Sequence, residues 1–140
     1  MHILFVCTGN TCRSPMAEAL LRKKTDVHTA SSAGISVLFS TPASPKAVLA
    51  MEEYGLDITG HRSRQLTEEL VEKADKILTM TGTHKMLVCE FFPSAQGKTF
   101  TLGEFAGHPE RDVSDPFGRS AETYLTCADE IAKLLEESPL

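Results

Sequence analysis

Near the N-terminus, an apolar run passes directly into a small polar loop and then a proline, in the order Ile3-Leu4-Phe5-Val6-Cys7-Thr8-Gly9-Asn10-Thr11-Cys12-Arg13-Ser14-Pro15. The continuous apolar run predicts a buried strand that ends at Cys7. Ser14 and Pro15 are typical of a helix N-terminus, with serine as the cap and proline in the first turn. The pattern therefore places Cys7 and Arg13 in one loop between a strand and a helix.

This loop has the features of an anion-binding cradle with a nucleophile at its base. Its backbone N–H groups would point inward, and the following helix adds the positive end of its dipole. Arg13 can bind two phosphoryl oxygens at once, and the positive surroundings would lower the pKa of Cys7, whose thiolate is the attacking form. We therefore expect phosphoryl transfer through a phosphocysteine. The predicted phosphate-binding residues are Thr8, Gly9, Asn10, Thr11, Cys12, Arg13 and Ser14.

The rest of the chain shows strand and helix patterns in alternation. Strands are expected at 2–7, 27–32, 76–80 and 98–102, helices at about 15–24, 45–54, 67–74, 83–92 and 121–137, and a long polar loop at 103–119. This alternation predicts an α/β fold in three layers, with a parallel sheet, right-handed crossovers and helices on both faces. With 140 residues and no linker or internal repeat, we expect a single domain over 1–140.

The chemistry also needs an acid that protonates the leaving group and then activates water. Ligands of parallel sheets bind beyond the carboxyl ends of the strands, where the cysteine loop and the 103–119 loop both emerge. Asp115 is the candidate, because Pro116 fixes the backbone after it and a Phe-Gly turn follows. Asp112 lies three residues away and stays open as an alternative.

Composition limits the other possibilities. A net charge of −5 argues against general nucleic-acid binding. No apolar run approaches the length of a membrane span, and the start shows no signal-type leader, so a cytoplasmic location is expected. The four cysteines do not suggest a disulfide framework, and no second closely spaced Cys or His pair suggests a metal site. We expect no cofactor, since Arg13 and the loop amides can stabilise the transition-state charge.

Three segments together resemble the low-molecular-weight protein tyrosine phosphatase family. They are residues 6–18, Ser32-Ala33-Gly34 and Asp115-Pro116-Phe117-Gly118, which follow one another in the family's order. Within that family, the chain is most similar to the bacterial branch of protein arginine phosphatases. The resemblance implies a Rossmann-like, four-stranded parallel sheet with flanking helices. It also implies Cys7 as nucleophile, Arg13 as phosphate binder and Asp115 as general acid and base.

The resemblance further implies three residues that support the loop. Ser14 would donate a hydrogen bond to the thiolate, and Asn10 would hold the loop in an unusual conformation. His61 matches a family histidine that buttresses the loop.

Thr11 bears on the substrate. Tyrosine-specific members of the family usually carry an aliphatic residue there, which can pack against a phenyl ring. Threonine suits a narrower pocket around a guanidinium, which could pair with the Asp115 carboxylate and lie near Phe39 or Phe117. We therefore hypothesise a protein arginine phosphatase that acts on phosphorylated proteins as a monomer.

Cys12 is the candidate resolving thiol, which would form a disulfide with an oxidised Cys7 and protect it. The histidines at 84 and 108 are expected on the surface.

Other activities remain as alternatives. The nearest is a phosphotyrosine phosphatase, which differs only in the lining of the pocket. An arsenate reductase would need two further cysteines seven residues apart, but Cys89 has Gly82 and Gln96 at those distances. A phosphocysteine carrier of a sugar transport system would not need Arg13-Ser14 or Asp115, and a silent phosphate-binding module would have no use for a complete catalytic set.

Overall fold

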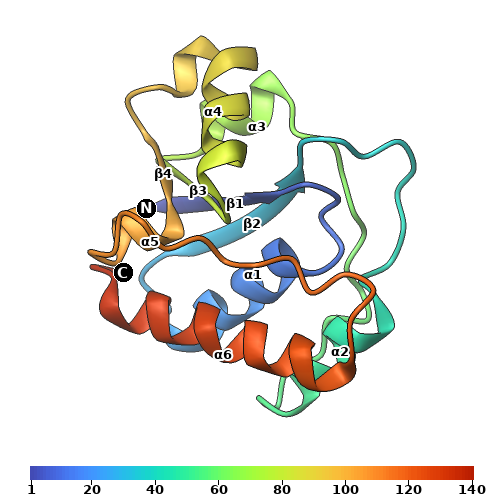
Figure 1. Ribbon diagram of the computed structural model, residues 1–140. Helices are drawn as coiled ribbons and strands as arrows, with labels where there is room; N and C mark the ends of the chain where they lie inside the picture. The colour runs from blue at the N-terminus through green and yellow to red at the C-terminus, as the bar shows by residue number, and fades with distance from the viewer.

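The computed structural model describes all 140 residues, which are built around one four-stranded sheet (Figure 1). All strand pairs are parallel, and the strands lie in the order β2-β1-β3-β4. Their bounds are β1 His2–Cys7, β2 Thr29–Gly34, β3 Lys76–Thr79 and β4 Thr99–Thr101. The predicted four-stranded parallel sheet is therefore confirmed, with β1 between β2 and β3.

Helices cover both faces of this sheet. Figure 1 shows α1, α2 and α6 on one face and α3 and α4 on the other. The bounds are α1 Arg13–Lys24, α2 Pro45–Glu52, α3 Glu68–Lys73, α4 Gly82–Phe91, α5 Leu102–Phe105 and α6 Ala121–Glu137, with a 3₁₀ turn at Pro93–Ala95. None of the helices combines the length and apolarity that crossing a bilayer requires.

The central strand β1 divides the core in two. Successive side chains of a strand point to opposite faces. Ile3 and Phe5 accordingly belong to a cluster of 25 buried residues that includes α1 and α6. Leu4 and Val6 belong to a cluster of nine with α3 and α4. The predicted three-layer α/β class is confirmed by this arrangement.

Two element boundaries differ from expectation. Strand β2 covers Thr29–Gly34 rather than 27–32, so it reaches further toward the segment from Cys7 to Ser14, which is called the catalytic loop below. The region expected to be a loop from residue 103 begins instead with the short helix α5. Thr101 caps this helix by accepting a hydrogen bond from the Glu104 N–H, and the Glu104 carboxylate accepts one from the Thr101 N–H. This reciprocal capping box stabilises a helix of only four residues.

The carboxyl ends of the strands bring distant loops together. Cys7 is the last residue of β1, and the Met80 carbonyl, just after β3, accepts a hydrogen bond of 2.9 Å from the Val113 N–H. This bond holds the 106–120 loop against the end of the sheet. Gly34 ends β2 directly beneath the catalytic loop, where a Cβ atom would lie 2.6 Å from the Thr8 carbonyl oxygen. Only glycine permits this close approach.

Candidate active site

A small cavity of about 230 Å³ opens at the end of β1. The residues that line it are Cys7, Thr8, Gly9, Thr11, Cys12, Arg13, Asp115 and Phe117. Six of the eight lie between Cys7, the last residue of β1, and Arg13, the first residue of α1, and two come from the 106–120 loop. The structure therefore brings the predicted nucleophile, arginine and acid to one cavity, although Asp115 lies 102 positions after Arg13 in the sequence.

Ser14 connects the nucleophile to the loop that surrounds it. Its hydroxyl oxygen lies 2.9 Å from Cys7 Sγ and accepts a hydrogen bond of 2.8 Å from Asn10 Nδ2. The Asn10 Nδ2 atom can only donate, so the Ser14 hydroxyl accepts this hydrogen bond and its own proton is free to be donated to the sulfur. We expected Ser14 to cap α1, but that prediction was wrong. Helix α1 begins at Arg13, so Cys12 occupies the N-cap position and gives no side-chain cap, while Ser14 lies in the first turn.

The environment of Cys7 contains opposing effects on its acidity. Burial raises the pKa of the Cys7 thiol and outweighs the effects that lower it. The lowering effects come first from the Ser14 hydroxyl and backbone N–H, then from the Arg13 charge and the Asn10 N–H. The expected net lowering of the pKa is therefore not observed. Ser14 and Arg13 are the groups through which the site can stabilise a thiolate.

Asn10 holds the loop in its required shape. It is the one non-glycine residue with a positive φ, at 56°. Its side-chain oxygen accepts a hydrogen bond of 3.0 Å from the Arg64 N–H, and its backbone carbonyl lies 2.7 Å from His61 Nε2. A carbonyl can only accept, so Nε2 carries the proton. The structure places Asn10 and His61 where they can support the loop, and these supporting roles stay predictions.

Arg13 is buried and oriented by the opposite loop. Its Nη1 donates a hydrogen bond of 2.8 Å to the Val113 carbonyl, and its Nη2 lies 3.7 Å from Asp115 Oδ2. Val113 is itself held to the sheet, so the guanidinium has a fixed position at the cavity wall. Arg13 lines the same cavity as Cys7, so its guanidinium can bind the oxygens of a phosphoryl group there.

The structure separates the two candidate acids. Asp115 lines the cavity with its side chain half exposed, and its Oδ1 accepts a hydrogen bond of 3.1 Å from the Phe117 N–H. Asp112 lies outside the cavity, where its Oδ1 accepts a hydrogen bond of 3.0 Å from the Gly82 N–H at the start of α4. The geometry therefore favours Asp115 as the proton donor.

The predicted specificity residues are only partly brought together. Thr11 and Phe117 line the cavity, whereas Phe39 is 79% exposed on the loop after β2 and does not line it. Cys12 lines the cavity beside Cys7, and both sulfurs are free thiols. The resolving role of Cys12 stays a prediction.

Two residues at the site were missed by sequence reasoning. Tyr124 of α6 lies with its hydroxyl 3.5 Å from Cys12 Sγ, and burial raises its pKa to about 12. His84 of α4 lies with Nε2 2.9 Å from Thr8 Oγ1. It was expected on the surface, which is wrong: it is buried, and its Nδ1 has no hydrogen-bond partner. Burial, with the charge of Arg13, lowers the pKa of His84 to about 4, so this histidine is neutral near pH 7.

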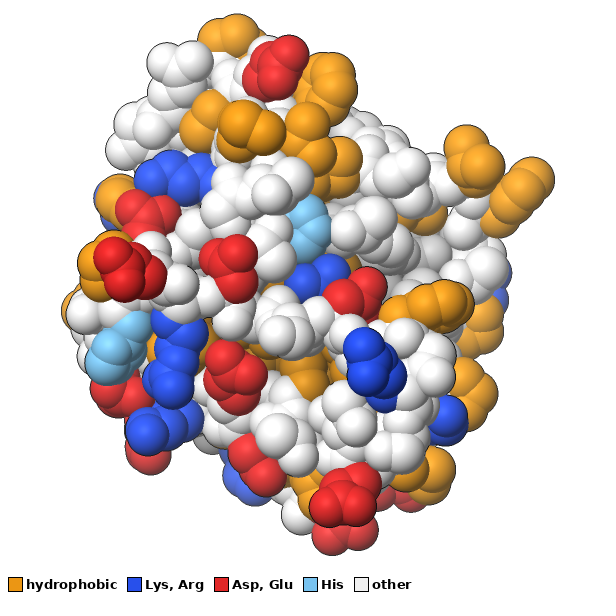
Figure 2. Space-filling view, viewed as in Figure 1, with side chains coloured by type: hydrophobic (Ala, Val, Ile, Leu, Met, Phe, Trp, Pro, Cys, Tyr) orange, Lys and Arg blue, Asp and Glu red, His pale blue; other side chains and the backbone are white.

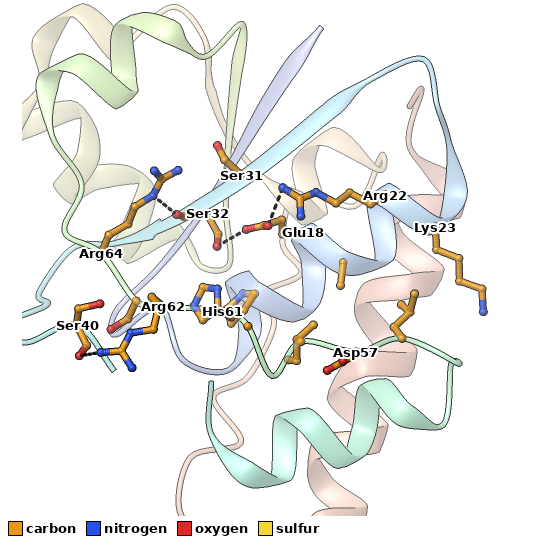
Figure 3. Close-up of a pocket in the computed structure, with 16 residues that line it drawn as sticks. Glu18, Arg22, Lys23, Ser31, Ser32, Ser40, Asp57, His61, Arg62 and Arg64 are labelled. Carbon is orange, nitrogen blue, oxygen red and sulfur yellow. Dashed lines mark hydrogen bonds and ion pairs between the residues drawn. The ribbon is translucent and has the colours of Figure 1, made fainter. Parts of the chain in front are cut away.

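A larger cleft of about 810 Å³ contains His61 and Arg64, but none of the residues of the catalytic cavity (Figure 3). Figure 3 shows Arg64 and Arg22 reaching toward β2, where they donate hydrogen bonds to the Ser32 and Ala30 carbonyls. Because β2 is an edge strand, these arginines cover carbonyl groups that no neighbouring strand pairs. The arginines of this cleft therefore have a structural role at the edge of the sheet, and the cleft contains no cysteine. No group of three or more His, Cys, Asp or Glu side chains is arranged to hold a metal ion.

Comparison with known proteins agrees with this geometry. Residues 2–138 match the family described as low molecular weight phosphotyrosine protein phosphatase. A protein-arginine-phosphatase of Geobacillus stearothermophilus is 44% identical over 136 residues, covering 96% of this chain and 91% of the relative. The low molecular weight protein-tyrosine-phosphatase Ptp of Acinetobacter johnsonii is 42% identical over 116 residues, covering 83% and 80%.

A solved structure of an arginine phosphatase is also similar to this chain over nearly its whole length. It is described as the YwlE arginine phosphatase, a C7S mutant with a phosphorylated active-site serine. It superposes with a TM-score of 0.91 at 42% identity, covering 98% of this chain and 92% of that chain. The fold, the cysteine loop and the matches over nearly the whole length lead to one conclusion: this chain belongs to the low molecular weight phosphotyrosine protein phosphatase family.

Proposed function

We propose that this protein is a protein arginine phosphatase that hydrolyses phosphoarginine through a phosphocysteine. The observation that carries the proposal is the single cavity in which Cys7 forms the base, Arg13 a wall and Asp115 the rim. The names of relatives support the choice of substrate, since a protein-arginine-phosphatase is 44% identical over most of both chains.

In the first step, the Cys7 thiolate attacks phosphorus while the phosphoryl oxygens bind Arg13 and the loop amides. The S–P bond forms and the P–N bond to the guanidine breaks. The leaving nitrogen needs a proton, which Asp115 donates from the open side of the cavity, opposite the nucleophile. The buried donors stabilise the charge that develops on the phosphoryl oxygens.

In the second step, a water molecule takes the place of the departed guanidine. Asp115, now a carboxylate, accepts a proton from this water as it attacks phosphorus. The S–P bond breaks, phosphate leaves, and the Cys7 thiolate is restored. The Ser14 hydroxyl, 2.9 Å from Cys7 Sγ, stabilises the sulfur as the leaving group of this step.

The lining of the cavity supports a guanidinium in place of a phenyl ring. Thr11 presents a short polar side chain to the cavity, and the Asp115 carboxylate at the rim can pair with a cation. A phosphotyrosine phosphatase is the second candidate, because Phe117 also lines the cavity and its exposed ring could stack on a phenyl group.

The deciding experiment compares turnover of a phosphoarginine peptide with that of a phosphotyrosine peptide of the same sequence context. We expect a higher kcat/KM for phosphoarginine, and no turnover of either peptide by Cys7→Ser. A preference for phosphotyrosine would overturn the proposed substrate but keep the mechanism. Turnover of neither peptide would instead favour a carrier or a phosphate-binding module.

A Thr11→Ile variant tests whether Thr11 determines the preference for phosphoarginine over phosphotyrosine. The variant should lose phosphoarginine activity relative to phosphotyrosine activity, because an aliphatic side chain removes the polar hydroxyl beside the guanidinium and can pack against an aromatic ring. An unchanged ratio of the two kcat/KM values would exclude Thr11 as the selecting residue.

A further inference from the structure

A third cavity, of about 400 Å³, lies between α4 and the segment that follows β2. We call it the α4 groove, and its lining residues are Ile35, Gln65, Leu66, Leu87, Val88, Phe91 and Phe92. All but Gln65 are apolar. Phe91 is 62% exposed, so the groove opens to the surface and is not a void within the core. An open apolar groove of this kind is a typical binding feature.

Both walls of the α4 groove are attached to the catalytic loop. On α4, Leu87, Val88 and Phe91 follow His84 at three, four and seven residues, which places all four on one helix face. His84 bonds to Thr8 of the catalytic loop, at 2.9 Å. The opposite wall begins at residue 35, whose N–H donates a hydrogen bond of 3.0 Å to the carbonyl of residue 7. The groove and the substrate-binding cavity share no lining residue, but the elements that form the groove are hydrogen-bonded to the loop that forms the cavity.

The same face of the molecule carries further exposed apolar groups. Figure 2 shows hydrophobic side chains gathered over α4 and again at the tip of the protruding loop after β2. The loop residues are Leu38 and Phe39, which are 90% and 79% exposed, and Phe117 at the cavity rim is exposed as well. Exposed apolar side chains therefore lie in separate patches over α4, on the loop after β2 and at the cavity rim, all on one face of the molecule.

We propose that the α4 groove binds an apolar side chain of the substrate protein, about two or three residues from the phosphorylated residue. The inference rests on the proposed function, which requires a polypeptide substrate. A helix rises about 1.5 Å per residue, so the groove lies roughly 5–10 Å along α4 from His84. An extended chain spans about 3.3–3.6 Å per residue, which gives the stated spacing.

The size of the groove favours this occupant over a second copy of the chain. Seven residues line it, whereas a stable subunit interface uses roughly 20–30 residues from each partner. A single inserted side chain needs no more than such a groove provides. Its walls are apolar, so a leucine or phenylalanine is preferred over a charged residue.

The test uses phosphoarginine peptides that differ at one position, with leucine or serine placed three residues before or after the phosphoarginine. Leucine on one of the two sides should raise kcat/KM by about 10-fold, since burying a large apolar side chain gives roughly one decade of affinity or more. Phe91→Ala should remove most of this gain. Met86→Ala is the matched control, because Met86 is 60% exposed on the same helix but does not line the groove.

The possible outcomes distinguish a failure of the groove proposal from a failure of the proposed function. Equal turnover of leucine and serine peptides at both positions would overturn the groove proposal while leaving phosphoarginine hydrolysis intact. If no phosphoarginine peptide is hydrolysed, the proposed function fails, and the leucine–serine comparison on phosphotyrosine peptides then tests the groove alone. A wild-type dimer that Phe91→Ala converts to a monomer, with no effect of leucine, would make the groove a subunit interface and refute the proposal.

Discussion

Replacing Ser14 with alanine tests how the site prepares its nucleophile. The Ser14 hydroxyl lies 2.9 Å from Cys7 Sγ, and it is the largest of the effects that lower the pKa of this thiol. A hydrogen bond to a charged group contributes roughly 1.5–3 kcal/mol, and one pKa unit corresponds to about 1.36 kcal/mol. Ser14→Ala should therefore raise the pKa of Cys7 by roughly one to two units.

The assay follows alkylation of Cys7 by iodoacetamide across pH, with the modified peptide quantified by mass spectrometry. This readout separates Cys7 from Cys12, Cys89 and Cys127, which are also free. In Ser14→Ala, the pH at which alkylation of Cys7 reaches half of its maximal rate should rise by roughly one to two units. The value of kcat/KM at pH 7 should fall roughly 10- to 100-fold.

Ser32→Ala is the matched control. Ser32 is as buried as Ser14, but its hydroxyl donates to Glu18 Oε1 at 2.7 Å and does not contact the nucleophile. Its alkylation midpoint should equal that of the wild type. A folded Ser14→Ala variant with an unchanged midpoint would refute the reasoning, because the hydroxyl would then contribute nothing to the acidity of Cys7.

Three further predictions concern other parts of the molecule. Asp115→Asn should lower kcat on phosphoarginine about 10²- to 10⁴-fold, whereas Asp112→Asn should keep most of the activity in the same steady-state assay. The pKa of His84 is about 4 in the folded protein against 6.5 when unperturbed, so the unfolded chain binds more protons between these values. The free energy of unfolding should therefore fall as the pH drops from 6.5 toward 4. In His84→Gln, urea unfolding over the same pH range should not show the part of this fall that is due to His84. In Gly103→Ala, the new Cβ would overlap the backbone carbonyl oxygen of Arg111, so urea unfolding should show a loss of roughly 1–3 kcal/mol in the free energy of unfolding. Gly97→Ala, with open space around it, should show no such loss.

The catalytic loop could be predicted because its chemistry is contiguous in the sequence. Cys7 and Arg13 belong to one strand–loop–helix unit, and the apolar run before them identifies the strand. Asp115 lies far away in the sequence, but its position follows from a general rule, since the carboxyl ends of parallel strands meet at one edge of the sheet. Local pattern and topology together therefore locate the three residues of the proposed mechanism.

His84 and Tyr124 could not be placed in this way. Their contacts join residues 76 and 112 positions apart, and nothing near them in the sequence signals such contacts. A histidine near the start of an amphipathic helix is equally compatible with exposure. Only the packing of α4 and α6 against the end of the sheet decides which of their polar side chains reach the loop.

Other errors arose where one sequence signal allows two structures. A serine before proline is typical of a helix cap, yet the Ser14 hydroxyl has a competing partner in Cys7 Sγ and bonds to that instead. Helix α5 was missed although its signal was present, because Thr101 and Glu104 have the spacing of a capping box. A helix of one turn has too few residues to show an apolar period.

The place of Cys7 at the end of the central strand has a consequence for the motions of the site. Strand β1 is paired on both sides and belongs to both core clusters, so its amide hydrogens should be among the slowest to exchange with solvent. Asp115 lies on a loop with its side chain half exposed, where local opening costs far less. The nucleophile and the acid therefore belong to opposite ends of the protein's range of local stability. Substrate can enter and product can leave by small movements of the acid-bearing loop, while the phosphate-binding loop keeps its shape throughout.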